Sequence, residues 1–87
     1  MELADHVALI TGGTAGIGWE SARLMASEGA TVIISGRDRE RGEQAAARLG
    51  EKARFVQADL SDMESVHSLV QQVGAVDVVV NNAANFT

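Results

Sequence analysis

The 87-residue chain is 46% apolar and 22% charged and has a formal net charge of −5, which is the composition of a soluble globular protein. A general nucleic-acid binder needs a basic surface to displace counterions from phosphates, so the net charge disfavours that class, and the absence of cysteine excludes disulfides and thiolate chemistry. The acidic first residues and the lack of an apolar run of spanning length predict a cytoplasmic protein with no membrane partner.

The first part of the chain alternates between apolar runs and amphipathic stretches. Residues 7–10 form a short, wholly apolar run, as expected for a strand buried on both faces of a parallel sheet. Gly29 stands where a glycine ends a helix, and residues 31–35 read as a second strand. A helix is predicted before Gly29, because Ile17, Ser21, Leu24 and Met25, three of them apolar, fall on one of its sides.

The same alternation continues to the end of the chain. Asp38 is a candidate N-cap for a charged, alanine-rich helix that ends at Gly50, and residues 54–58 read as a weaker third strand. Ser61 and Glu64 have the spacing of a capping box and predict the start of a third helix. The apolar face of that helix is predicted to comprise Val66, Leu69, Val70 and Val73, with Gly74 after it, before a fourth strand at residues 76–80.

Seven elements in this order predict an α/β fold with a doubly wound, Rossmann-like parallel sheet in the strand order 3-2-1-4. The ligand crevice is expected where the strand order reverses, between the first and fourth strands. An apolar fourth strand would leave an open edge, which folded proteins avoid. We therefore expect residues 1–87 to be the N-terminal half of a dinucleotide-binding domain, interrupted after the fourth strand.

A glycine-rich loop, residues 11–18, separates the first strand from the first helix. Its glycines allow a sharp turn and a close approach to a ligand, and the helix start behind it offers free N–H groups suited to a pyrophosphate. The loop is not a Walker loop, because Gly18 is followed by Trp19-Glu20 and not by Lys-Ser/Thr. The spacing is Thr-Gly-x-x-x-Gly-x-Gly, and Thr14 stands where the commoner Gly-x-Gly-x-x-Gly pattern needs glycine.

Three motifs, in the expected order and spacing, resemble those of the short-chain dehydrogenase/reductase family over essentially the whole chain. The glycine loop is the first, and Asp59-Leu60 resembles the family's acid-plus-aliphatic pair that meets the adenine. The third is Asn81-Asn82-Ala83-Ala84, which is similar to the family's Asn-Asn-Ala-Gly, with alanine in place of the final glycine. The resemblance implies a sheet-stabilising role for Asn81 and these cofactor-binding residues: Gly12, Thr14, Ala15, Gly16, Ile17, Gly18, Asp59, Leu60, Asn82, Ala83 and Ala84.

The end of the second strand bears on the choice between NAD and NADP. An acid there selects the ribose 2′-OH of NAD, whereas an arginine suits the 2′-phosphate of NADP. Asp38 is twenty residues after Gly18, about where the acid is expected, but the position directly after the strand is Gly36, followed by Arg37. Asp38 also has an adequate role as a helix cap, so Arg37 favours NADP. A second NADP marker, a basic residue just before the second motif glycine, is missing, because that residue is Ala15.

The resemblance implies a hydride-transferring oxidoreductase that acts on a small alcohol or carbonyl substrate and forms a homo-oligomer when full length. The family's catalytic asparagine, serine and Tyr-x-x-x-Lys pair cannot be assigned here, because the chain contains no tyrosine. We therefore expect no catalytic residue and no turnover from these 87 residues alone. The alternatives are a non-catalytic NADP-binding regulatory module, an NAD-dependent member of the family, or a remnant of a longer chain.

Three further residues have simpler interpretations. His6 and His67 lack a carboxylate or second histidine at metal-ligand spacing, so no metal site is predicted. Trp19, just after the glycine loop, is expected to pack between helices.

Overall fold

The computed structural model describes residues 5–12, 16–59 and 61–81. Strands and helices alternate along the chain as predicted. Their bounds are β1 Val7–Thr11, α1 Gly16–Ser27, β2 Thr31–Gly36, α2 Arg39–Leu49, β3 Ala53–Gln57, α3 Met63–Val73 and β4 Val78–Asn81. Among the described residues, no helix is long and apolar enough to cross a membrane.

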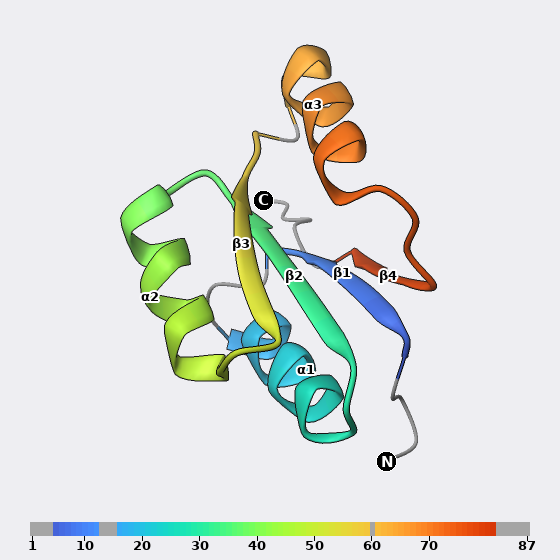
Figure 1. Cartoon of the computed structure of the whole chain (residues 1–87). Coiled ribbons are helices and arrows are strands. Elements are labelled where there is room, and N and C mark those ends of the chain that lie inside the picture. Colours follow the sequence, from blue (N-terminus) through green and yellow to red (C-terminus); the bar gives the residue numbers. More distant parts are fainter. Residues whose placement is uncertain (1–4, 13–15, 60, 82–87) are drawn as a thin grey trace.

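The described strands form one parallel sheet in the order β3-β2-β1-β4, so the predicted fold class and strand order are confirmed. Helices α1 and α2 pack on one face of this sheet and α3 packs on the other (Figure 1). A parallel sheet with helices on both faces is the doubly wound arrangement. Because each strand enters from the same side, the carboxyl ends of all four strands and the starts of the helices lie along one edge.

The central strands are buried on both faces. Ile10, Val32 and Ile34 point into the apolar cluster under α1 and α2, whereas Leu9 and Ile33 point into the cluster under α3. This alternation follows from the two-residue period of a strand and confirms that residues 7–10 are covered on both sides. At the β4 edge the burial is lower, and Val79 is 59% exposed.

The apolar face predicted for α1 is wrong. Ile17 and Leu24 are 77% and 55% exposed, and Met25 is only half-buried. The buried residues of α1 are instead Gly18 and Ala22. Small side chains let the helix lie close to the sheet, and of the predicted apolar residues only Met25 packs against the core cluster.

Helix α1 ends in a Schellman motif at the predicted glycine. The N–H of Gly29 donates to the carbonyl of Ala26, and the N–H of Ala30 donates to the carbonyl of Met25. Gly29 has a φ of 99°, a left-handed conformation that a residue with a Cβ rarely adopts. The chain can therefore turn directly from α1 into β2.

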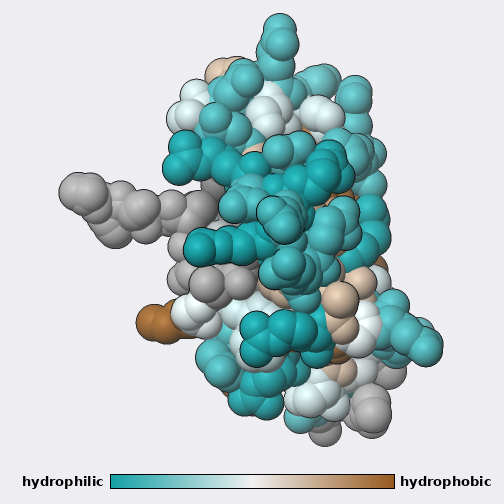
Figure 2. Space-filling view, turned by 90° about the vertical axis from the view of Figure 1, so that its left-hand side faces the viewer, coloured by the Kyte–Doolittle hydropathy of each residue, from teal (hydrophilic) through white to brown (hydrophobic). Residues whose placement is uncertain are grey.

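Helix α2 is capped as predicted and packs against β2 and β3. The Asp38 carboxylate accepts a hydrogen bond from the N–H of Arg41 at 3.1 Å, and the helix ends at Gly50. Its inner face is buried through Gly42, where an added Cβ would overlap the ring of Phe55 on β3. The outer face is almost wholly hydrophilic (Figure 2). Its charged and small residues therefore separate cleanly between solvent and sheet.

The capping box predicted for α3 is wrong in its cap residue. Asp62, not Ser61, is the N-cap, and its carboxylate accepts from the N–H of Glu64. Ser61 instead donates through both its N–H and its hydroxyl to the Asp59 carboxylate, at 3.0 and 2.7 Å. Because these contacts occupy Ser61 one position before the helix, the adjacent aspartate takes over the cap.

The apolar face of α3 is narrower than predicted. Leu69 is buried, but Val70 is 60% exposed, and Val66 and Val73 are only half-buried. Strand β4 also begins later than predicted, because Asp77 exchanges hydrogen bonds with the backbone of Val7 before the regular pairing starts. The Asp77 carboxylate takes the place of a strand carbonyl at that end of the sheet.

Trp19 joins α1 to α2, as predicted. Its indole N–H donates to the carbonyl of Ala45 at 3.3 Å, and the guanidinium of Arg48 lies over the ring, 4.8 Å from its centroid. Trp19 thus anchors the first turn of α1 to the neighbouring helix.

Candidate functional site

The glycine loop begins at the carboxyl end of β1. The N–H of Gly12 donates to the carbonyl of Ser35 at 2.9 Å, which ties the start of the loop to the end of β2. Gly12 has a φ of 69°. The loop therefore leaves the sheet beside the ends of β1 and β2, at the edge where an α/β sheet binds its ligands.

The other end of the loop is the first turn of α1. Gly16 has a φ of 63°, and a Cβ built there would meet no described atom within 4 Å. Backbone conformation and not crowding from the described residues therefore requires glycine at this position. The first turn of α1 contains no acidic residue, and Ile17 is exposed beside Gly16. Within the described residues, no acid in the first turn opposes the partial positive charge of this helix start, which suits an anionic group such as a pyrophosphate.

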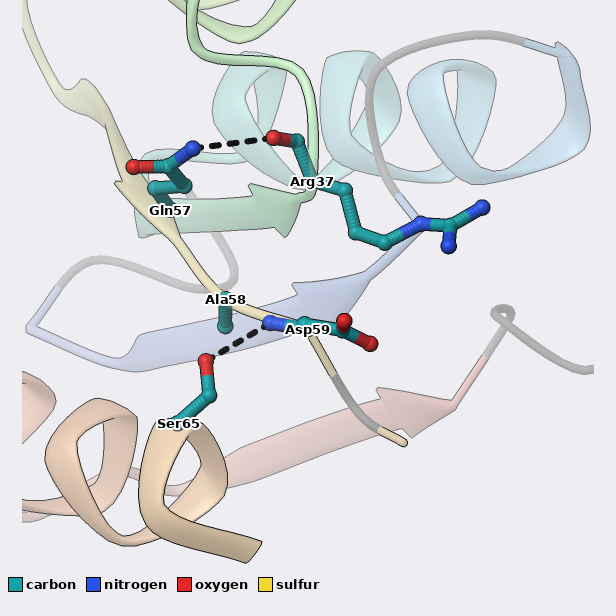
Figure 3. Close-up of a pocket in the computed structure, with 5 residues that line it drawn as sticks. All are labelled: Arg37, Gln57, Ala58, Asp59 and Ser65. Atoms are coloured by element: carbon teal, nitrogen blue, oxygen red, sulfur yellow. Dashed lines mark hydrogen bonds between the residues drawn. The ribbon is translucent and has the colours of Figure 1, made fainter. Parts of the chain in front are cut away.

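A second part of the site is a cavity of about 300 Å³ at the carboxyl ends of β2 and β3. It is lined by Arg37, Gln57, Ala58, Asp59 and Ser65. Figure 3 shows that the side chains of Arg37 and Asp59 extend in the same direction from these strand ends, away from Gln57. The cavity therefore presents one cation and one carboxylate to a polar ligand.

Asp59 is held by its neighbours in the charged form. Its carboxylate accepts from the Ser61 hydroxyl and then from the Ser61 N–H, and these hydrogen bonds, with a smaller effect of the Arg37 charge, hold the pKa of Asp59 below its ordinary 3.8. Desolvation acts in the opposite direction but does not reverse the shift. The N–H of Asp59 donates to the Ser65 hydroxyl at 2.7 Å, which fixes the backbone at this position (Figure 3). Asp59 is consequently a fixed hydrogen-bond acceptor at neutral pH.

The three clustered arginines have different environments. Arg37 lines the cavity, is exposed, and makes no side-chain hydrogen bond or ion pair with the described residues. Arg39 donates to the Gln57 side chain at 3.1 Å and lies 3.6 Å from the Glu43 carboxylate. Arg41 lies in the first turn of α2 and is not among the lining residues. Within the described residues, Arg37 is thus the arginine available to a ligand in the cavity.

The structure brings together only part of the predicted site. Gly12, Gly16, Ile17 and Gly18 lie at the carboxyl end of β1 and the start of α1, and Arg37 and Asp59 share the cavity. Six further predicted residues lie outside the described ranges: Thr14, Ala15, Leu60, Asn82, Ala83 and Ala84. Asn81 ends β4, where it pairs in register with Thr11.

Sequence reasoning missed three residues of the cavity, Gln57, Ala58 and Ser65. None of them belongs to a recognisable motif, and only the packing of β3 against α2 and α3 shows that they contact the site. Among the described residues, no group of three or more histidines, aspartates or glutamates could hold a metal ion. The His67 ring contacts the Gln71 side chain on the surface of α3.

The doubly wound sheet and the glycine loop at the end of β1 define a Rossmann-like α/β protein. Comparison with known proteins gives the particular family: the family described as short chain dehydrogenase matches residues 6–86, and the chain belongs to it. This is a family of oxidoreductases, and the resemblance read from the three motifs is confirmed.

Individual relatives agree with this assignment. Galactitol 2-dehydrogenase of Agrobacterium fabrum is 42% identical over 90 residues, which cover 99% of this chain and 35% of that protein. A solved structure titled "short chain dehydrogenase/reductase family protein" superposes with a TM-score of 0.96 at 63% identity, covering 99% of this chain and 37% of the other. The Pseudomonas aeruginosa RhlG/NADP active-site complex superposes with a TM-score of 0.89 at 37% identity, covering 97% and 36%. The chain spans about a third of the length of the curated relatives it matches.

Proposed function

We propose that residues 1–87 are the cofactor-binding part of an NADP(H)-preferring oxidoreductase whose complete protein interconverts an alcohol and a carbonyl compound. A nicotinamide dinucleotide, when bound, supplies or accepts the hydride. The residues of this chain would bind and orient it, and the groups that act on the substrate would come from elsewhere in the protein. The relative named galactitol 2-dehydrogenase supports an alcohol or carbonyl substrate.

The free side chain of Arg37 is the observation that carries the preference for NADP. Gly36, directly before it, has no side chain that would repel or obstruct a phosphate, and Arg37 extends into the cavity without a hydrogen-bond partner among the described residues. A guanidinium can bind a phosphate through two parallel hydrogen bonds. The neighbour titled as an NADP complex supports this choice of cofactor.

The competing candidate for the ribose, Asp38, has another role. Its carboxylate accepts from the N–H of Arg41 and caps α2. This capping role is enough to explain an aspartate at position 38. Asp38 also does not line the cavity within the described residues. These contacts favour Arg37 over Asp38 as the residue that meets the 2′ position.

The other groups of the cofactor would be bound by different residues along the same edge of the sheet. The N–H groups at the start of α1, beginning at Gly16, would receive the pyrophosphate, and the ionised Asp59 carboxylate would accept from the adenine amino group. The described residues fit each of these groups in charge and hydrogen-bonding capacity. Residues 82–84, which follow β4, are proposed to run along the cofactor as the resemblance implies.

The test is Arg37→Ala in the complete gene product. Loss of one charge-assisted contact should shift the ratio of the NADP and NAD dissociation constants toward NAD by about ten- to a hundredfold. Arg41→Ala is the matched control, because it removes an arginine of the same cluster that does not line the cavity. Binding titration with each dinucleotide measures the ratio, and an unchanged ratio in Arg37→Ala would contradict the proposal.

A further inference from the structure

Gln57, the last residue of β3, connects two of the clustered arginines. Its side-chain N–H donates to the backbone carbonyl of Arg37 at 3.0 Å, and its side-chain oxygen accepts from the guanidinium of Arg39 at 3.1 Å. Figure 3 shows the amide of Gln57 on the side of the Arg37 backbone opposite to the Arg37 guanidinium. The amide group thus uses its donor on one arginine and its acceptor on the other.

The contact to Arg37 holds the backbone directly after Gly36, at the end of β2. β2 ends at Gly36, whose missing Cβ leaves its backbone the widest choice of conformations. The Gly36 carbonyl accepts from the N–H of Ala58 at 2.9 Å, and the next carbonyl, that of Arg37, accepts from Gln57. Two successive peptide groups at the exit of β2 are therefore held by Gln57, the last residue of β3, and by Ala58, which follows it. These contacts restrain the backbone from which the Arg37 side chain extends.

The contact to Arg39 separates the two guanidinium groups. Arg39 is held between Gln57 and the Glu43 carboxylate, outside the set of residues that line the cavity. A glutamate at position 57 could accept from Arg39 but could not donate to the Arg37 carbonyl, and a leucine could do neither. An amide of this length supplies both contacts at once.

We propose that Gln57 is a positioning residue for cofactor selectivity, which holds the Arg37 backbone so that its guanidinium faces the 2′-phosphate. This inference rests on the proposed role of Arg37 in binding that phosphate. Gln57 itself does not contact the phosphate: it acts through Arg37. Its removal should therefore weaken recognition of the 2′-phosphate and leave recognition of the rest of the adenosine unchanged.

The experiment compares two probes, adenosine 2′,5′-bisphosphate and adenosine 5′-monophosphate, which differ only in the 2′-phosphate. In Gln57→Leu of the complete gene product, the preference for the bisphosphate should fall by about two- to tenfold, the range for loss of one neutral hydrogen bond. The dissociation constant of the monophosphate should stay at its original value. Gln57→Glu should lose at least as much preference, because it lacks the donor to Arg37 and adds a negative charge.

Gln44→Leu is the matched control, since Gln44 is exposed on α2 and makes no side-chain hydrogen bond with the described residues. It should leave both dissociation constants unchanged. If Gln57→Leu binds both probes more weakly by the same factor, the substitution has damaged the site in general and the inference is overturned. An unchanged preference for the bisphosphate in Gln57→Glu would also overturn it. If Arg37→Ala alters the preference and Gln57→Leu does not, the positioning role fails and the proposed function stands. If Arg37→Ala has no effect, both fail.

Discussion

The helices of the described structure begin along the same edge of the sheet, but α1 begins differently from α2 and α3. Asp38 and Asp62 cap α2 and α3, and each of these helices has a glutamate in its first turn. α1 begins at Gly16 with no acidic residue in its first turn. Carboxylates at a helix start satisfy N–H groups and neutralise the positive end of the helix dipole.

This difference indicates which helix start is available to a ligand. In α2 and α3 the chain supplies its own anions, so an external phosphate would meet negative charge and N–H groups already in use. In α1 the glycine at the helix start keeps the backbone accessible, and the dipole is not opposed by an acid in the first turn. The chain therefore caps two helix starts with its own acids, and the proposed pyrophosphate site rests on the third, the start of α1.

Gly16→Ala tests the open helix start most strongly. The new side chain must adopt a φ of 63°, which costs about 1–2 kcal/mol, so the loop should relax away from its binding conformation and cofactor affinity should fall about five- to thirtyfold. Titration of the complete gene product with NADP measures this effect.

Gly74→Ala is the matched control for this substitution. Gly74 follows α3, has a φ of 68°, and also has no described atom within 4 Å of an added Cβ. Each variant places alanine at a positive φ and should lose about 1–3 kcal/mol of the free energy of unfolding, but Gly74→Ala should bind NADP with unchanged affinity. Equal affinities in the two variants would show that the start of α1 is not a binding element.

Asp38→Ala tests the closed start of α2. Loss of the cap should lower the free energy of unfolding by about 1 kcal/mol, measured by denaturant titration. Asp38→Ser retains a capping oxygen without the charge, so it should retain most of the stability. A lower affinity for adenosine 5′-monophosphate in both variants would instead identify Asp38 as the acid that binds the ribose.

Ser61→Ala should have the smallest effect of these substitutions, and that effect is on the pKa of Asp59. The Asp59 carboxylate lines the cavity and does not cap a helix. The hydroxyl of Ser61 is the largest cause of the lowered pKa of Asp59, so its removal should raise that pKa toward 3.8. A carboxyl with a lowered folded pKa stabilises the fold above its unfolded pKa, and this contribution is lost as the pH falls through the folded pKa. The Ser61→Ala variant should lose the stabilising contribution of Asp59 at a higher pH than the original protein. An NMR titration of the Asp59 carboxyl checks the shift, and an unchanged midpoint would assign it to another group.

The sequence predicted the strands better than the helix faces. Residues 7–10 and 31–35 are β-branched or otherwise apolar runs between turn residues, and they lie in β1 and β2. The face of α1 was wrong because periodicity counts Ile17 and Leu24 as core, whereas the sheet packs closely against Gly18 and Ala22. The predicted cap of α3 was wrong because Ser61 donates to Asp59 and leaves the cap to Asp62. Sequence spacing alone does not show which of these two adjacent residues caps the helix.

For the site, the sequence predicted the glycine loop, Arg37 and Asp59, and it favoured Arg37 over Asp38 as the residue that meets the ribose. The structure distinguishes their contacts, since Asp38 caps α2 and Arg37 lines the cavity. Gln57 could not have been found from a motif. Its contacts depend on the close packing of the exit of β3 against the exit of β2.

The sequence by itself determined the order of the elements, the fold class and the family, because apolar runs, glycine spacing and three short motifs are properties of neighbouring residues. Only the tertiary structure decided which arginine lines the cavity and which side of α1 is buried. These depend on contacts such as that of Gln57 with Arg37, twenty positions apart, which exist only once parallel strands are paired. The start of α1 depends on both: its glycines are visible in the sequence, and its position at the edge where the strands end follows from the parallel sheet.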